Sequence, residues 1–131
     1  MIVPDASAFA LTFAGDDPRA EQADSALRAD PAWLVPEHWH VEVLAVIRGL
    51  LLGRRLDEDR AEAAVVALAS ATVAVTPTGP LLPRMWQVRS NLSTYDAAYV
   101  AAAEAHDATL VTADARIARA GVARCPIRTI V

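Results

Sequence analysis

Lysine is absent from this chain of 131 residues, so all twelve basic residues are arginine. The absence excludes enzymes that need a lysine: P-loop nucleotidases, Schiff-base enzymes, and the phosphatases and receiver domains that place a lysine beside their aspartates. The sixteen acidic residues give a formal net charge of −4 at pH 7. A broad basic surface for nucleic acid is therefore also missing.

Cysteine and long apolar segments are scarce as well. The one cysteine, Cys125, cannot form an internal disulfide or a cysteine-rich metal site, which is typical of a reducing compartment. The longest apolar stretches, residues 41–47 and 63–75, are shorter than the roughly 18 to 20 residues that span a bilayer. Residues 1–10 contain an acid and no base, unlike a secretory signal. We therefore expect a cytoplasmic protein without membrane contact.

Strand-like runs alternate with helical patterns in a composition that is 54% hydrophobic and 21% charged, which is typical of a globular domain. Short apolar or β-branched runs predict strands at residues 2–3, 33–35, 72–75, 109–112 and 127–131. Apolar periodicity predicts helices at residues 6–13, 18–29, 37–52, 57–70, 81–88, 94–105 and 115–120. The alternation predicts one α/β domain, residues 1–131, with a parallel sheet that helices cover on both faces.

Two acidic residues stand where a predicted strand ends. Asp5 follows the strand at residues 2–3, and Asp114 follows the strand at residues 109–112. Since ligands bind at the edge where parallel strands end, we expect the two carboxylates to share that edge. The alternative for each residue alone is a helix N-cap, which stabilises a helix by about 1 kcal/mol.

Two further acids lie among apolar residues of predicted helices. Glu42 lies in HWHVEVLAVIRGLL, which is apolar nearly all round and is expected to be buried against the sheet. Asp96 lies in STYDAAYVAAAEAH, with Tyr99 and Val100 on its own face. An ionised carboxylate on such a surface needs a compensating partner. The alternatives are a capping box opened by Ser93 for Asp96 and a salt bridge with an arginine for Glu42.

The four acids together predict a metal site. Two carboxylates about 5 Å apart repel by roughly 3 kcal/mol at an effective dielectric constant of about 20, so convergence requires protons or cations. Carboxylate oxygens suit Mg²⁺, which retains waters for chemistry on a phosphodiester. Without these four, twelve acids balance twelve arginines, so local arginines would have to assist the metal in attracting a substrate. The arginines considered are Arg48, Arg84, Arg89, Arg116 and Arg119.

Other polar and aromatic residues also have a simpler structural interpretation. Thr112 is an ordinary β-branched strand residue, and Ser7 an ordinary first-turn helix residue. The histidines are expected to contact partners or solvent instead of a metal: His38, His40 and His106. The tryptophans are expected in core or dimer contacts: Trp33, Trp39 and Trp86.

With the four acids placed, the sequence resembles PIN-domain ribonucleases, and in particular VapC, the toxin component of type II toxin–antitoxin pairs. The resemblance runs nearly from end to end and rests on DASA at Asp5, VEVL at Glu42, YDAAYVAAAE at Asp96 and LVTADARIARA at Asp114. The last two motifs, close together and in this order, are its most specific part. The turn HDA at residues 106–108 departs from the glycine-containing turn that is usual in the family.

The resemblance implies a three-layer α/β/α domain, with a central parallel sheet of four to five strands, that uses Mg²⁺ or Mn²⁺ to cut RNA. It implies catalytic and metal-binding roles for four acids, with Asp5 and Asp96 as the principal ligands. Glu42 and Asp114 would complete the acidic pocket. The residues expected to support the pocket are Thr112 and Ser7. The resemblance also implies a homodimer and a small antitoxin that covers the acidic mouth.

The leading hypothesis is a Mg²⁺-dependent endoribonuclease that acts as a toxin, in which a metal-bound water attacks an RNA phosphodiester. The alternative from another class is a PIN-fold binding module that has lost cleavage, in which the acids only cap helices and tryptophan-bearing helices recruit a partner. A metal-dependent DNA or flap nuclease is the nearest other enzyme, although those relatives usually carry extra loops. No base-reading motif identifies the RNA sequence.

Overall fold

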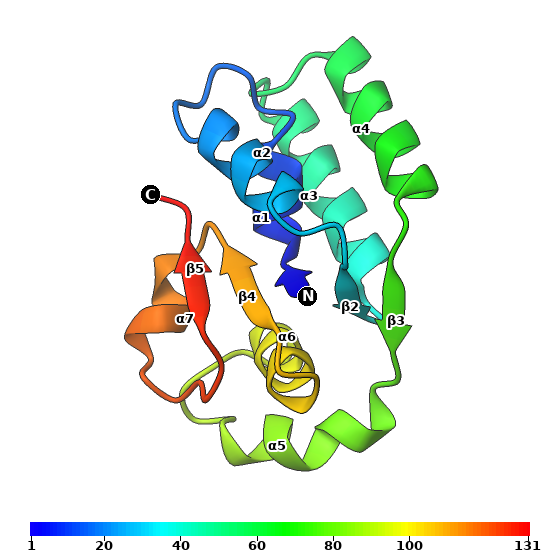
Figure 1. Cartoon of the computed structure of the whole chain (residues 1–131). Coiled ribbons are helices and arrows are strands. Elements are labelled where there is room, and N and C mark those ends of the chain that lie inside the picture. The colour runs from blue at the N-terminus through cyan, green and yellow to red at the C-terminus, as the bar shows by residue number, and fades with distance from the viewer.

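Five short parallel strands form the centre of the computed structural model, which describes residues 1–131 (Figure 1). One group has the order β1-β4-β5 and consists of β1 (Ile2–Pro4), β4 (Thr109–Thr112) and β5 (Ile127–Thr129). The second group pairs β2 (Leu34–Pro36) with β3 (Ala74–Thr76). A single parallel bridge between Ile2 and Trp33 joins the two groups. The predicted parallel sheet of four to five strands is confirmed.

Helices lie on both sides of these strands. The bounds are α1 (Ala6–Leu11), α2 (Ala20–Arg28), α3 (Trp39–Leu52), α4 (Glu58–Ser70), the 3₁₀ turn η1 (Gly79–Leu81), α5 (Leu82–Gln87), α6 (Thr94–Ala105) and α7 (Ala115–Arg119). In Figure 1, α1 to α4 lie above the strands and α5 and α6 below them, while α7 packs beside β5. This arrangement gives the predicted α/β/α layers. None of the helices combines the length and the hydropathy that crossing a bilayer requires.

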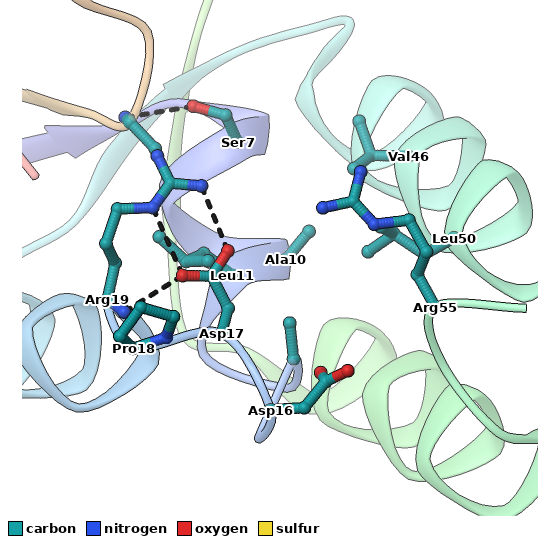
Figure 2. A pocket seen from close by; sticks show the side chains of 12 residues that line it. Ser7, Ala10, Leu11, Asp16, Asp17, Pro18, Arg19, Val46, Leu50 and Arg55 are labelled. Carbon is teal, nitrogen blue, oxygen red and sulfur yellow. Dashed lines mark hydrogen bonds and ion pairs between the residues drawn. The ribbon is translucent and has the colours of Figure 1, made fainter. Parts of the chain in front are cut away.

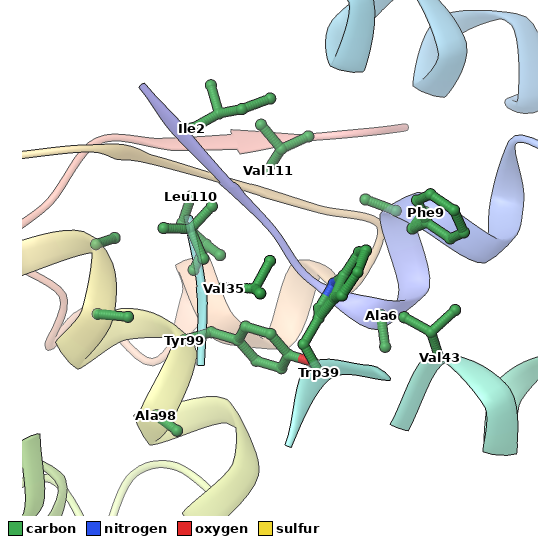
Figure 3. Packing of buried hydrophobic residues seen from close by; sticks show 14 of the residues in the cluster. Ile2, Ala6, Phe9, Val35, Trp39, Val43, Ala98, Tyr99, Leu110 and Val111 are labelled. Atoms are coloured by element: carbon green, nitrogen blue, oxygen red, sulfur yellow. The ribbon is translucent and has the colours of Figure 1, made fainter. Parts of the chain in front are cut away.

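The core is one connected cluster of 35 buried residues. Figure 3 shows Trp39 of α3, Tyr99 of α6 and Val35 of β2 close together in this cluster. Phe9 of α1 meets Trp39 edge to face, with ring centroids 5.2 Å apart. Every residue of α6 from Ala97 to Ala103 is buried, and most are alanine. Their small side chains let α6 lie close to β1, β2 and β4.

The prediction that α3 is buried on nearly all sides against the sheet is wrong. α1 packs on β1 and β4, and α3 packs on α1 and α4, so α3 belongs to the outer part of the helical layer. It buries only Trp39, Val43 and Ile47. Val41 is 74% exposed and Leu44 is 47% exposed, so α3 keeps an apolar face in solvent.

Two local departures from the predicted elements have visible causes. α3 begins at Trp39 and not at residue 37, and the Glu37 carboxylate instead accepts hydrogen bonds from the backbone N–H and Oγ1 of Thr78. In the HDA turn after α6, Asp107 has φ 51°, a left-handed conformation that glycine adopts freely and that aspartate tolerates better than most residues. The turn therefore keeps its shape without glycine.

Truncation of the central strand tests this core. Leu110 is fully buried in β4, between β1 and β5. Leu110→Ala is expected to lower the free energy of unfolding by about 2–5 kcal/mol, because the lost side chain leaves a cavity. Val75 of β3 is 50% exposed, so Val75→Ala is expected to cost about 0.5 kcal/mol or less. Urea denaturation of both variants measures the difference, and equal losses would contradict the central position of β4.

Candidate acidic site

Asp5 lies at the junction of β1 and α1, and its side chain is almost completely buried. One carboxylate oxygen accepts hydrogen bonds from Ser7 Oγ at 2.6 Å and from the backbone N–H of Ala8 at 2.9 Å. The other oxygen accepts a hydrogen bond from Thr112 Oγ1 at the end of β4. Burial raises the pKa of Asp5 to about 6 although these hydrogen bonds lower it, and the charge of Asp96 adds to the rise.

Two hydroxyl groups connect Asp5 to the second acidic strand end. Thr112 Oγ1 accepts a hydrogen bond from the backbone N–H of Asp114 at 2.9 Å. Ser7 Oγ accepts one from the backbone N–H of Ala113 at 3.0 Å. Asp5 and Asp114 therefore lie at the same edge of the sheet, where the sequence predicts them.

Asp96 lies half-buried in the first turn of α6. Ser93 is the N-cap of this helix, and its Oγ accepts a hydrogen bond from the backbone N–H of Asp96 at 3.2 Å. Burial raises the pKa of Asp96, and the charges of Asp114 and Glu42 raise it further. Since the charge of Asp96 also acts on Asp5, its carboxylate interacts with all three other acids.

Glu42 lies in the first turn of α3, and its neighbour is His38, one turn earlier in the chain. His38 Nε2 and Glu42 Oε2 are 2.9 Å apart but lack the alignment of a hydrogen bond. The His38 ring also packs against Tyr95 and Tyr99, with centroids 5.4 and 4.9 Å away. The side chain that lies against the Glu42 carboxylate is therefore a histidine and not an arginine. The sequence analysis missed this role of His38, although its i, i+4 spacing from Glu42 carries the signal.

Three buried polar atoms at this site have no hydrogen-bond partner: His38 Nε2, Glu42 Oε2 and the hydroxyl of Tyr99. Burial raises the pKa of Tyr99, as do the charges of Glu42 and Asp5, so its hydroxyl stays protonated. Buried polar groups without partners cost free energy unless water or a ligand satisfies them. His38 Nε2 and Glu42 Oε2 lie 2.9 Å from each other and can satisfy one another, and the Tyr99 hydroxyl lies near Glu42. Tyr99 was not predicted as part of the site, although it lies one helical turn from Asp96.

Asp114 is the N-cap of α7, and its carboxylate forms an ion pair with the guanidinium of Arg116. Oδ1 accepts hydrogen bonds from the backbone N–H and from Nε of Arg116, each at 3.0 Å. Oδ2 accepts hydrogen bonds from Nε at 3.2 Å and from Nη2 at 2.7 Å. These bonds to the guanidinium lower the pKa of Asp114.

An open hollow of about 400 Å³ lies at these side chains. It is lined by His38, Val41, Glu42, Ala45, Ser93, Tyr95, Asp96 and Arg116. The predicted convergence of four acids is looser than expected, because no three carboxylates are grouped closely enough to hold one ion. Hydroxyls hold Asp5, Arg116 holds Asp114, and His38 lies against Glu42. Mg²⁺ usually takes one or two carboxylates together with waters and phosphates, so the donor set still suits it.

A second hollow, of about 410 Å³, lies between α1, the loop before α2, and α3 (Figure 2). Ser7, which binds Asp5, is part of its lining. Arg19 at the rim pairs with Asp17 at 3.0 Å. Figure 2 shows the guanidinium of Arg55 pointing into this hollow, and Arg55 forms no ion pair. The hollow thus combines a partly apolar lining with one unpaired positive charge.

Comparisons with known proteins agree with this fold. A sequence profile of the PIN domain matches residues 2–123. Ribonuclease VapC9 of Mycobacterium tuberculosis is 39% identical over 99% of this chain and 98% of its own length. Ribonuclease VapC12 of the same organism is 34% identical over 91% of each chain. The crystal structure of M. tuberculosis VapC20, described as a sarcin-ricin loop cleaving toxin, superimposes with a TM-score of 0.69 at 22% identity, over 92% of this chain and 95% of VapC20.

The chain has a parallel sheet, and the profile matches nearly its whole length. These two findings identify it as a PIN domain. Within the PIN domains, the match to VapC9 over nearly the whole of both chains indicates the VapC group. The chain belongs to the VapC family of PIN-domain proteins. The resemblance seen in the sequence is thereby confirmed.

The raised pKa of Asp5 predicts how stability depends on pH. In the folded chain its pKa is about 6, against 3.8 for the ordinary side chain, so its contribution to stability is lost as pH rises through 6. Asp5→Asn cannot ionise and is expected to raise the free energy of unfolding at pH 7.5 in EDTA by up to about 3 kcal/mol, with the difference shrinking towards pH 4. Urea denaturation of the wild type and Asp5→Asn at pH 7.5 and pH 4 measures the difference in the free energy of unfolding. The exposed Asp59→Asn serves as control, and a stability difference between Asp5→Asn and the wild type that stays the same at pH 7.5 and pH 4 would contradict the raised pKa.

Proposed function

We propose that this protein is a metal-dependent endoribonuclease, the toxin of a type II toxin–antitoxin pair, with residues 1–131 as one PIN domain. The relatives VapC9 and VapC12, which match over most or all of their length, are named ribonucleases. The observation that carries the proposal is the position of Asp96, which lines one hollow together with Glu42 and lies near enough to Asp5 and Asp114 for their charges to influence one another.

Asp5 and Asp96 are the proposed principal ligands of Mg²⁺ or Mn²⁺, and Glu42 and Asp114 complete the acidic pocket. When bound, the ion would offset the charge of the phosphodiester and activate a water for in-line attack. Burial raises the pKa of Asp96 and the charges of Asp114 and Glu42 raise it further, which supports this assignment because a cation beside the carboxylate would offset both effects.

The surrounding residues orient the proposed ligands. Ser7 and Thr112 each donate a hydroxyl hydrogen to Asp5, so the Asp5 carboxylate is held from both sides. Burial and the charges of Glu42 and Asp5 keep the Tyr99 hydroxyl protonated, so it can donate a hydrogen bond in the site. His38 packs against two tyrosines, and its Nε2 lies 2.9 Å from the Glu42 carboxylate at the hollow.

Capping contacts favour a second candidate function, a PIN-fold binding module without cleavage. Asp5, Asp96 and Asp114 each lie at the start of a helix and take part in its capping hydrogen bonds. If capping were their only role, asparagine would serve nearly as well, because Asn and Asp are equally good N-caps. The two candidate functions therefore differ in their response to Asp→Asn substitutions.

Cleavage of RNA distinguishes the ribonuclease from the binding module. Purified protein freed of antitoxin is expected to cut total cellular RNA into discrete fragments in Mg²⁺ and not in EDTA. Asp96→Asn is expected to reduce the rate about 100-fold or more, because it removes a ligand and a charge at the centre of the site. Asp5→Ala is expected to have a similar effect. Gel analysis of the fragments over time measures each rate.

Asp107→Asn is the matched control, because Asp107 is exposed and lies just beyond the opposite end of α6. It is expected to cleave like the wild type. Cleavage that persists in EDTA would remove the metal from the proposal. If the wild type does not cleave, or if Asp96→Asn changes no measured property, the binding module becomes the better account.

We further propose a cytosolic homodimer that a small antitoxin inhibits. Trp86 is 69% exposed and Val41 is 74% exposed, so apolar side chains are available for contacts with a second subunit. An Arg-rich antitoxin tail would match the carboxylates at the mouth. The neighbouring hollow, with its apolar lining and the unpaired Arg55, suits an amphipathic segment of the same partner.

Growth measurements test the antitoxin. Expression of the chain alone in bacterial cells is expected to arrest growth, and co-expression with the product of the neighbouring gene is expected to restore it, because the partner covers the acidic mouth. Asp96→Asn is expected to permit growth in both cases. Arrest that continues with the neighbouring product present would remove the antitoxin from the proposal.

A further inference from the structure

Arg116 is the one arginine that lines the acidic hollow. The other arginines considered from the sequence lie elsewhere: Arg48 in a groove between α3 and α4, Arg84 in an ion pair with Glu104, Arg89 over the ring of Trp86, and Arg119 on the exposed surface of α7. The charge of Arg116 also acts on Asp96, where it lowers the pKa that burial raises. Arg116 is therefore the arginine of this chain that is placed to contact a substrate in the acidic hollow.

The carboxylate of Asp114 is fully engaged by Arg116. Both oxygens accept hydrogen bonds from the guanidinium, and Oδ1 also accepts the backbone N–H of Arg116. Charge-assisted hydrogen bonds of this bidentate kind are stronger than neutral ones. A metal ion that used Asp114 as a direct ligand would have to displace the guanidinium from one of these oxygens. Asp5 and Asp96 carry no such cationic partner.

The guanidinium of Arg116 still has hydrogen-bond donors to offer. Of its five N–H groups, the one on Nε and one on Nη2 are directed at Asp114, which leaves three. The side chain is 78% exposed, and it borders the same hollow as Asp96 and Glu42. A planar fork of donors matches the oxygens of a phosphate better than an ammonium does.

We infer that Arg116 binds a phosphate of the RNA strand at the acidic hollow, and that Asp114 is a positioning residue that holds the guanidinium there and is not a ligand of the metal. The inference rests on the proposed ribonuclease function and refines the role of one of its four acids. Asp114 and Arg116 form a neutral unit, so the negative charge left for a cation comes from Asp5, Glu42 and Asp96.

Two readouts separate this role from metal binding. Mg²⁺ affinity is measured by calorimetric titration of the metal-free protein, and kcat and KM are measured for cleavage of one RNA fragment. The variants are Arg116→Gln, Asp114→Asn, the double variant that carries both changes, and Asp96→Asn. Arg119→Gln is the matched control, because Arg119 is an exposed arginine on the same helix that does not line the hollow.

Arg116→Gln is expected to raise KM about tenfold or more with a smaller change in kcat, because it removes a charge-assisted contact to the substrate. Asp114→Asn is expected to raise KM by a similar factor, and the double variant no more than either single variant, since the two residues act as one unit. The double variant is expected to bind Mg²⁺ within about twofold of the wild type, because it removes no net charge. Arg119→Gln is expected to match the wild type in every measurement.

The inference is overturned if the double variant loses Mg²⁺ affinity as Asp96→Asn does, since Asp114 would then be a ligand. It is equally overturned if Arg116→Gln leaves KM at the value of the Arg119→Gln control. A wild type that binds Mg²⁺ but cuts no RNA would end the proposed function and the phosphate contact with it. The titration of the double variant would still decide whether Asp114 binds the metal.

Discussion

The hydrogen bonds around the Asp5 carboxylate are the contact on which the acidic site depends. They join the start of the chain to a strand end 107 positions later, through Thr112, and the Ser7 hydroxyl adds a second connection to the same strand end. Because Thr112 also accepts the N–H of Asp114, one side chain sets the relation between two acids. These bonds offset only part of the cost of burying a charge, and the remainder is visible as the raised pKa of Asp5.

Each of the other acids is compensated in a different way, which explains how a small domain keeps four carboxylates near one another. Asp114 is neutralised by Arg116, Glu42 lies against His38, and Asp96 gains only a capping contact through its backbone. Asp5 and Asp96 are the two acids of the site whose pKa is raised, so they are the ones that a cation would stabilise most. The acids can cap helices and also serve in catalysis. The capping hydrogen bonds fix the first turn of each helix, and this places the charged side chains at the edge of the sheet.

The packing of α3 and α6 brings the first turns of these helices to the acidic hollow. The buried alanines of α6 bring that helix close to β1, β2 and β4, and they bring Tyr99 near enough to Glu42 and Asp5 for their charges to add to the rise in its pKa that burial causes. α3 is held one layer further out, on α1, so that its first turn borders the hollow while Val41 and Leu44 remain in solvent. The same arrangement that supplies Glu42 to the site thus leaves an apolar surface beside it.

The sequence by itself determined the alternation of strands and helices, the parallel sheet and the common edge of Asp5 and Asp114, because apolar periodicity and strand-to-helix order are local properties. It also determined that Asp5, Asp96 and Asp114 begin helices, since capping depends on neighbours within a few residues. Only the tertiary structure decided that α3 packs on a helix and not on the sheet, and that Tyr99 of α6 reaches the acids. These contacts depend on which layers meet and on rotamers chosen in a crowded core, and neither is encoded in the spacing of residues along one element.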